Sequence, residues 1–257
     1  MLASRSMRRF LFWQLPLVLA LVAAIAFAGG FLSFLRGDTG VPVNIVTRPS
    51  QDSAPREKIA PMILGDSLAR GTGDETGLGV GGRLVDELHR RKINTANIVN
   101  VAVNGARTQD LLQQLEGSNI RRLLSQSNVI ILSIGGNDLW GDNNWRTAAP
   151  RDPEAVMDQV LAKVEKSEQL VRSASPHGRI FIIGLYNPFV TTPVGAVLTP
   201  FVNRWNAKLV ERFASDPNVV IVQTSDIFAF RDRLSLDRFH PGDEGYAMIA
   251  RRIADSL

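Results

Sequence analysis

Two short segments, far apart in the chain, carry side chains that together could perform nucleophilic catalysis. Ser67 stands in the sequence Gly-Asp-Ser-Leu, directly after an apolar run at 59–64. A serine hydroxyl is a weak nucleophile and needs a neighbouring base, a role that histidine can fill. Asp237 and His240 lie three residues apart, so one loop can hold a histidine beside the carboxylate that orients it. The residue types predict a serine nucleophile served by a histidine–aspartate pair.

Two other segments could stabilise the negative charge that develops when a serine attacks a carbonyl carbon. Gly105, in Asn-Val-Ala-Val-Asn-Gly-Ala, offers an unobstructed backbone N–H, and Asn137, in Gly-Gly-Asn-Asp, offers a side-chain amide. Each residue also has a simpler explanation, because Ser and Asp often cap helices and Gly and Asn often form turns. Their occurrence in order after successive predicted strands favours one shared site.

The elements that must position these residues alternate between apolar strands and amphipathic helices. Continuous Val, Ile and Leu runs are typical of strands that a parallel sheet buries on both faces. Strands are predicted at 59–64, 98–103, 129–134, 180–185 and 219–222, and helices at 80–91, 109–124, 153–173, 201–213 and 244–254. The repeated alternation predicts an α/β fold, a three-layer doubly wound sandwich with a parallel sheet. Ligand sites of open α/β sheets lie at the carboxyl edge, where all four segments would meet.

The N-terminal part of the chain differs from the rest. A basic stretch at 1–9 precedes an uncharged one at 10–35, which is long enough as a helix to cross a bilayer. We expect a transmembrane signal-anchor with the basic end in the cytoplasm, a linker at 36–58, and a domain at 59–257 outside the cytoplasmic membrane. A cleaved signal peptide is the alternative, because small residues at 24–28 fit a cleavage site, and the product would be secreted.

Composition narrows the chemistry further. The chain has no cysteine and only three histidines, so disulfides, thiol catalysis and a metal site are not expected. The net charge of +4 is small and the basic residues are scattered, so no nucleic-acid partner is expected. No cofactor is implied. Two segments are candidates for substrate contact, one at Trp140 and the other a long apolar stretch at 186–200 that includes Phe189 and Val190.

The four segments resemble the four sequence blocks of the SGNH hydrolases, also called GDSL esterases and lipases. The resemblance covers about 59–257 and implies a flavodoxin-like α/β/α sandwich with a five-stranded sheet. It also implies that Ser67 is the nucleophile, with His240 and Asp237 completing a triad. The Ser67 N–H, Gly105 and Asn137 would form the oxyanion hole.

The resemblance implies a serine esterase that hydrolyses carboxylic esters. The apolar stretch and the N-terminal segment favour lipid or lysophospholipid acyl esters, and O-acetyl groups on glycans or small acyl esters also fit. Two alternatives stay open: an O-acyltransferase acting on cell-surface glycans, and a surface-binding protein without turnover. The complete set of catalytic residue types argues against the last.

Overall fold

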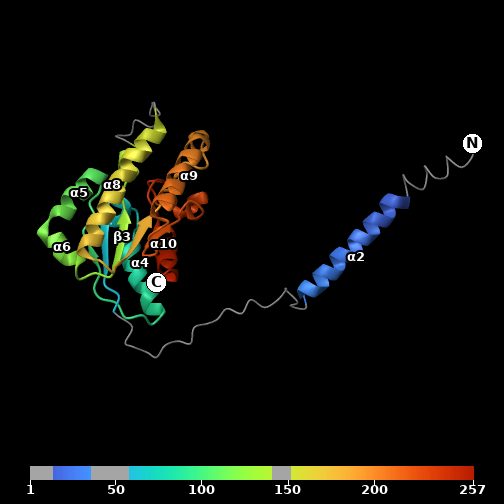
Figure 1. Ribbon diagram of the computed structural model, residues 1–257, viewed down its shortest axis with the longest axis horizontal. Coiled ribbons are helices and arrows are strands. Elements are labelled where there is room, and N and C mark those ends of the chain that lie inside the picture. Colours follow the sequence, from blue (N-terminus) through green and yellow to red (C-terminus); the bar gives the residue numbers. More distant parts are fainter. Residues whose placement is uncertain (1–13, 36–57, 141–151) are drawn as a thin grey trace, which may run out of the picture. The chain divides into compact units, whose positions relative to one another are not determined.

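The computed structural model describes residues 14–35, 58–140 and 152–257 (Figure 1). The expectations for the basic stretch at 1–9, for the start of the apolar stretch at 10–13 and for nearly all of the linker at 36–58 lie outside these residues. The chain divides into two units, 1–54 and 55–257. We call the described part of the second unit, 58–140 and 152–257, the folded body.

In the first unit, helix α2 (Leu15–Leu35) is made of apolar and small residues without a charge. Its side chains from 15 to 32 are exposed. Among the described helices, α2 is the one that is long and apolar enough to cross a membrane, and a signal sequence would meet the same criteria. The structure therefore agrees with a helical N-terminal segment and leaves anchor and signal peptide as the two explanations.

The folded body contains a five-stranded sheet and eight α-helices in the part of the chain described. The strands are β1 (Pro61–Gly65), β2 (Val99–Asn100), β3 (Val129–Ser133), β4 (Arg179–Ile183) and β5 (Val219–Val222). The helices are α3 (Ser67–Arg70), α4 (Gly79–Arg90), α5 (Thr108–Glu116), α6 (Ser118–Leu124), α7 (Gly136–Trp140), α8 (Pro153–Ala174), α9 (Pro193–Phe213) and α10 (Asp243–Asp255). Two short 3₁₀ turns, η3 (Ile227–Ala229) and η4 (Arg231–Arg233), precede the last helix.

All described strand pairs are parallel, and the strands follow the order β2-β1-β3-β4-β5. This is the flavodoxin-like order of doubly wound sheets, in which the chain changes direction between β1 and β3. The predicted α/β sandwich with a five-stranded parallel sheet is confirmed. Ligands of such folds bind where the direction changes, so the loops after β1 and β3 are the expected place for a site.

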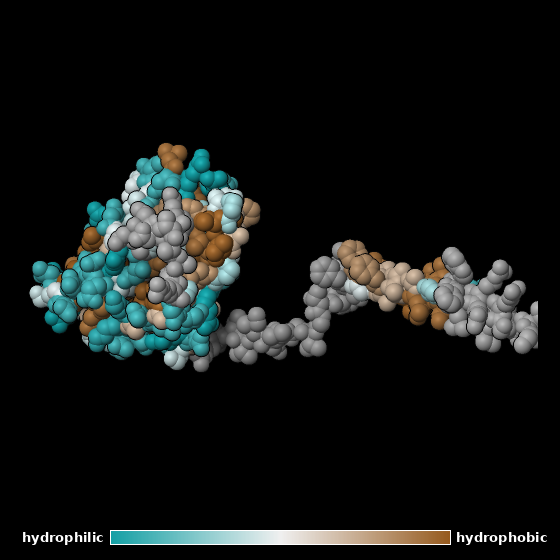
Figure 2. All heavy atoms as spheres, turned by 90° about the horizontal axis from the view of Figure 1, so that it is seen from above, coloured by the Kyte–Doolittle hydropathy of each residue, from teal (hydrophilic) through white to brown (hydrophobic). Residues whose placement is uncertain are grey.

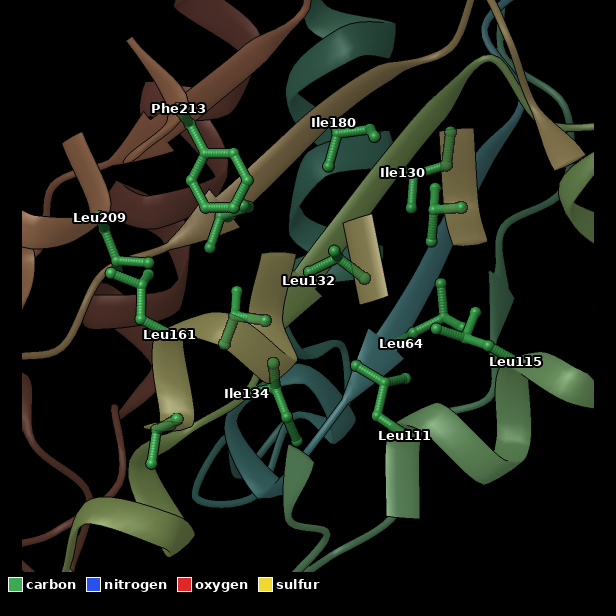
Figure 3. Packing of buried hydrophobic residues seen from close by; sticks show 14 of the residues in the cluster. Leu64, Leu111, Leu115, Ile130, Leu132, Ile134, Leu161, Ile180, Leu209 and Phe213 are labelled. Carbon is green, nitrogen blue, oxygen red and sulfur yellow. The ribbon is translucent and has the colours of Figure 1, made fainter. Parts of the chain in front are cut away.

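Helices cover both faces of the sheet. One face packs on α5, α6, α8 and α9, and the other on α4 and α10 (Figure 1). The alternation of side chains along each strand produces the two cores. In β3, Ile130 and Leu132 join the first core and Ile131 joins the second. Figure 3 shows the first core, with Leu132 between the helical side chains Leu111 and Leu161.

Several boundaries differ from the predicted ones for local reasons. The expected helix at 109–124 is interrupted at Gly117, whose extended backbone ends α5 and begins α6. The predicted second strand at 98–103 shortens to β2, although Val101 and Val103 still donate backbone hydrogen bonds to β1. Helix α9 begins at Pro193 rather than at 201, because Thr192 caps it and Pro193 suits its first turn.

The end of β1 approaches β3 so closely that only glycine fits. Gly65 pairs with Ser133, and its φ of 131° lies in the region that favours glycine. A Cβ atom at Gly65 would collide with the backbone carbonyl of Ser133. The tight approach therefore fixes how the chain leaves β1.

We predict that Gly65→Ala destabilises the folded body more than Gly77→Ala does. Gly77 also has a positive φ, of 71°, but a Cβ there has no neighbour within 4 Å. The Gly77→Ala variant therefore reports the backbone strain alone, which costs about 1–3 kcal/mol. At residue 65 the collision with β3 adds about 1–3 kcal/mol more. The melting temperatures of the full chain in detergent, followed by tryptophan fluorescence, make the comparison. Equal melting temperatures for the two variants would contradict the prediction.

Candidate active site

Ser67 is the first residue of α3, directly beyond the carboxyl end of β1. Asp66 caps this helix by accepting a hydrogen bond from the Leu68 N–H at 3.1 Å. The helix ends at Gly71, whose backbone N–H donates to the carbonyl groups of Ser67 and Leu68. The serine is thus held on a single tight turn at the sheet edge, where the sequence predicted it.

Asp237 and His240 lie in the loop between η4 and α10, and this loop holds itself together. Asp237 Oδ1 accepts hydrogen bonds from Ser235 Oγ at 2.6 Å, from Phe239 N at 2.8 Å and from His240 N at 2.9 Å. The other carboxylate oxygen, Oδ2, lies 2.6 Å from His240 Nδ1. Arg238 completes the turn with a φ of 56°.

The structure brings these two segments together at the sheet edge. His240 Nε2 lies 2.8 Å from Ser67 Oγ. Because a carboxylate can only accept, Nδ1 carries the proton toward Asp237, and Nε2 of the neutral ring is free to accept from the serine. This is the geometry of a nucleophile, a general base and an orienting carboxylate.

The charge of Asp237 suits this arrangement. Burial opposes its ionisation, but hydrogen bonds from His240 and Ser235 and from two backbone N–H groups outweigh burial and hold the pKa of Asp237 below its usual range. The carboxylate therefore stays ionised across the pH range in which a histidine titrates.

Asn137 lies in α7, at the carboxyl end of β3, and its side chain lines the same pocket as Ser67. Its Nδ2 atom donates one hydrogen bond to the Ala106 carbonyl at 2.9 Å and carries a second hydrogen. The next residue, Asp138, accepts hydrogen bonds from the Thr108 backbone N–H at 2.9 Å and from its hydroxyl at 2.6 Å. These contacts join the loop after β2 to the end of β3.

Gly105 lies in the loop after β2, with a φ of 77° that explains the glycine. It is exposed and lines a separate hollow with Asn104 and Ala106, not the pocket beside Ser67. The loop is nevertheless tied to the end of the serine turn, because Thr72 Oγ1 donates to Asn104 Oδ1 at 3.1 Å. The structure thus puts Gly105 near this edge without placing it in the pocket wall.

The pocket beside Ser67 and His240 is small, about 50 Å³. Its apolar wall is formed by Leu68, Trp140, Leu185, Tyr186, Pro188 and Phe239. A larger hollow of about 650 Å³ lies beside the Asp237–His240 loop and is lined by charges of both signs, but by neither Ser67 nor His240. The small pocket is therefore the one that can receive an ester carbonyl.

The three residues predicted to contact substrate lie at different distances from this pocket. Trp140 lines it and packs on Phe201, with ring centroids 5.7 Å apart. Phe189 stands behind the wall, with its ring 6.2 Å from that of Phe239. Val190 is 38% exposed and does not line the pocket.

Two buried tyrosines, which sequence reasoning missed, hold the two halves of the site. Tyr246 of α10 donates to the carbonyl groups of Leu68 at 3.2 Å and Thr72 at 2.8 Å, on the serine side. Tyr186 donates to the Phe239 carbonyl at 2.6 Å, on the histidine side. Their sequence context resembles that of ordinary core residues, so only the folded arrangement reveals the role.

Among the described residues, no three His, Cys, Asp or Glu side chains gather in a way that could hold a metal ion. The polar groups of the site are Ser67, His240, the carboxylates of Asp66 and Asp237, and backbone or amide groups. An arrangement of this kind can transfer an acyl group through the serine.

Comparisons with known proteins agree with this chemistry. The model of the GDSL-like lipase/acylhydrolase family matches residues 63–248. The chain is 27% identical to the uncharacterized protein YpmR of Bacillus subtilis over 81% of this chain and 85% of that protein. It is 24% identical to the spore germination lipase LipC of Bacillus licheniformis over 74% of this chain and 92% of that protein.

Solved structures show the same fold. The lipase Lip_vut3 from a goat rumen metagenome has a TM-score of 0.67 at 20% identity, over 77% of this chain and 97% of that one. The acetylxylan esterase Axe2 of Geobacillus stearothermophilus has a TM-score of 0.56 at 17% identity, over 77% and 93%. The resemblance seen in the sequence is confirmed: the chain belongs to the GDSL-like lipase/acylhydrolase family and is a carboxylic ester hydrolase.

Proposed function

We propose that Ser67 is the nucleophile of this esterase, with His240 as general base and Asp237 as the carboxylate that orients it. The unbroken chain of hydrogen bonds from Ser67 Oγ through the imidazole to Asp237 carries the proposal. Ser67 Oγ attacks the ester carbonyl carbon and its proton passes to His240 Nε2. Asp237 stabilises the imidazolium that forms.

The oxyanion would be stabilised by three donors. Ser67 and Asn137 both line the pocket, and they would supply the Ser67 backbone N–H and the second Nδ2 hydrogen of Asn137. The Gly105 N–H is the third donor. Because Gly105 is exposed at the sheet edge, either the substrate must reach this N–H or the loop must move it toward the oxyanion. Donors fixed before the reaction stabilise the developing charge without reorganisation, which is why they act mainly in the transition state.

The remaining steps need no further group. His240 returns the proton to the alcohol oxygen as the C–O bond breaks, leaving an acyl group on Ser67. Water then attacks the acyl carbonyl carbon, His240 takes its proton, and the acid leaves as the serine oxygen is protonated again. One histidine thus serves as base and as acid in each half of the reaction.

We propose lipid acyl esters as the favoured substrates, on the strength of the surface next to the pocket. From 180 to 203 the chain has no charged residue. Val194 and Val197 of α9 are 40% and 72% exposed and share one helix face with Phe201, which packs on the pocket residue Trp140. Figure 2 shows a brown hydrophobic patch on the right of the folded body seen from above, with smaller brown spots over the rest of the visible surface.

The pocket itself favours a second candidate. A space of about 50 Å³ receives the carbonyl end of an ester and no more than a short acyl group, so a longer chain must leave the pocket over apolar surface. O-acetyl esters of glycans need no such surface. LipC, a lipase, and Axe2, an acetylxylan esterase, are both similar to this chain.

We further propose that α2 anchors the esterase in the cytoplasmic membrane and that the folded body acts outside it. The basic stretch at 1–9 and the length of the apolar helix support this topology. An anchored enzyme meets lipid esters without diffusing to them, which agrees with the favoured substrate class. A secreted form cut near residue 28 is the competing outcome.

We predict that a fluorophosphonate probe labels the wild-type chain and not Ser67→Ala. The probe reacts with an activated serine oxygen, and loss of the nucleophile also lowers the rate of ester hydrolysis by roughly 10⁴- to 10⁶-fold. Ser173→Ala, on the exposed face of α8, is the control that keeps labelling and activity. Labelling of a folded Ser67→Ala variant would overturn the nucleophile assignment.

We predict that replacing both Val194 and Val197 by Asp lowers kcat/KM for a monomeric octanoyl ester about 10- to 100-fold and leaves the acetyl ester of the same alcohol unchanged. Each buried methylene contributes about 0.8 kcal/mol, and the charges remove that contribution from the longer chain only. Val210→Asp, on the same helix and 44% exposed, is the matched control. No preference of the wild type for octanoyl over acetyl would favour the O-acetyl candidate.

A further inference from the structure

The buried carboxylate next to the serine has no part in the mechanism above. Asp66 is 7% exposed and lines the same pocket as Ser67 and His240. Carboxylates are seldom buried in this way unless they are paired or fully hydrogen-bonded. Its position and burial call for an explanation beyond the capping of a one-turn helix.

Asp66 is joined to β3 through both its backbone and its side chain. Its N–H donates to the Ser133 carbonyl at 2.9 Å, and Ser133 Oγ donates to Asp66 Oδ1 at 3.0 Å. The same Oδ1 accepts from the Leu68 N–H at 3.1 Å. The Asp66 carboxylate thus holds the start of α3 against β3, which constrains how Ser67 leaves the end of β1.

Asp66 also adds negative charge near the base. Burial raises the pKa of Asp66 to about 6, while the hydrogen bonds from Ser133 and Leu68 and the nearby His240 oppose the rise. The titratable groups that face it are His240 from the loop before α10, Tyr186 after β4 and Tyr246 of α10. Both tyrosines have pKa values raised above their usual range, first by burial and then by nearby charges that include Asp66, so they stay neutral.

We propose that Asp66 is a positioning residue: its carboxylate holds the Ser67 turn against Ser133 and, when ionised, favours the imidazolium of His240 during acyl transfer. The inference rests on the proposed roles of Ser67 and His240. It differs from capping, because a cap needs only an acceptor for one N–H, whereas this role needs the negative charge as well. Asp237 orients the His240 ring by direct contact, whereas Asp66 acts on the ring through its charge, from the pocket that Asp66 and His240 both line.

Asp66→Asn separates charge from shape. Asn retains an oxygen that can accept from Ser133 and Leu68, so the turn keeps its contacts, but the charge is gone. We expect kcat at pH 8 to fall on the order of tenfold with little change in KM, since one unit of histidine pKa corresponds to a factor of ten. The acid limb of the rate profile should move to lower pH, because the charge that favours imidazolium is absent.

Ser133→Ala should move the same limb in the opposite direction. It removes a hydrogen bond that favours ionised Asp66, so the carboxylate protonates at higher pH and activity is lost sooner as the pH falls. Opposite shifts from two neighbouring substitutions are not expected if both simply loosen the structure. Asp158→Asn, an exposed carboxylate on α8, controls for the loss of one negative charge from the body.

Stability supplies an independent readout. The pKa of Asp66 is higher in the folded chain than in the unfolded one, so its stabilising contribution is complete at low pH and is lost as the pH rises through about 6. The melting temperature of Asp66→Asn minus that of the wild type should therefore be more positive at pH 8 than at pH 5. A merely structural loss would give the same difference at both.

The full chain in detergent, hydrolysing p-nitrophenyl acetate, is the test system. Two results together support the proposal. Asp66→Asn has a lower kcat and an acid limb moved to lower pH, and Ser133→Ala has an acid limb moved to higher pH. Wild-type kcat for a folded Asp66→Asn variant, or a lower kcat with an unmoved limb, overturns it. Failure of the proposed function is a different result, in which Ser67→Ala keeps the activity of the wild type.

Discussion

The contact between the ends of β1 and β3 is the constraint on which the site depends. Gly65 faces Ser133 at a separation that excludes a Cβ atom, and Asp66 then bonds to Ser133 twice. This fixes the turn that presents Ser67 and places it beside α7, which begins directly after β3 and carries Asn137. The direction change of the doubly wound sheet falls between the same two strands, so topology and local sterics select one place for chemistry.

The site is built from local units that are joined by buried polar groups. Asp237 and His240 are held within one loop, and the start of α5 is bound to α7 through Thr108 and Asp138. The hydroxyl of Tyr186 then fixes the Asp237–His240 loop by donating to the Phe239 carbonyl, and that of Tyr246 fixes the serine turn to α10 by donating to the Thr72 carbonyl. Since a buried polar group without a partner costs about 1–3 kcal/mol, each of these bonds favours a single arrangement over looser ones.

The parallel sheet could be predicted because strand runs such as 129–134 are apolar throughout. The positions of Ser67 and Asn137 at its edge could be predicted because both closely follow such runs. The start of α9 could not be predicted from the sequence, because Pro193 and Pro200 are equally typical of loops. The Thr192 cap and the packing of Phe201 show that the segment is helical. Sequence could not predict the roles of Tyr186, Tyr246 and Ser133, because these roles depend on partners distant in sequence. The sequence could predict that Asp66 caps a helix, but it could not predict the burial of Asp66 against β3.

The hydrogen bond between Ser67 and His240 spans 173 residues, and α10 begins shortly after the histidine. In the proposed mechanism Ser67 therefore lacks its base until the segment that carries Asp237 and His240 has been made and has packed beside the serine turn. During synthesis the nascent chain would then be inactive, even when its first strands have already paired. Loss of the C-terminal helix by proteolysis would return the molecule to that inactive condition without touching either end of the hydrogen bond.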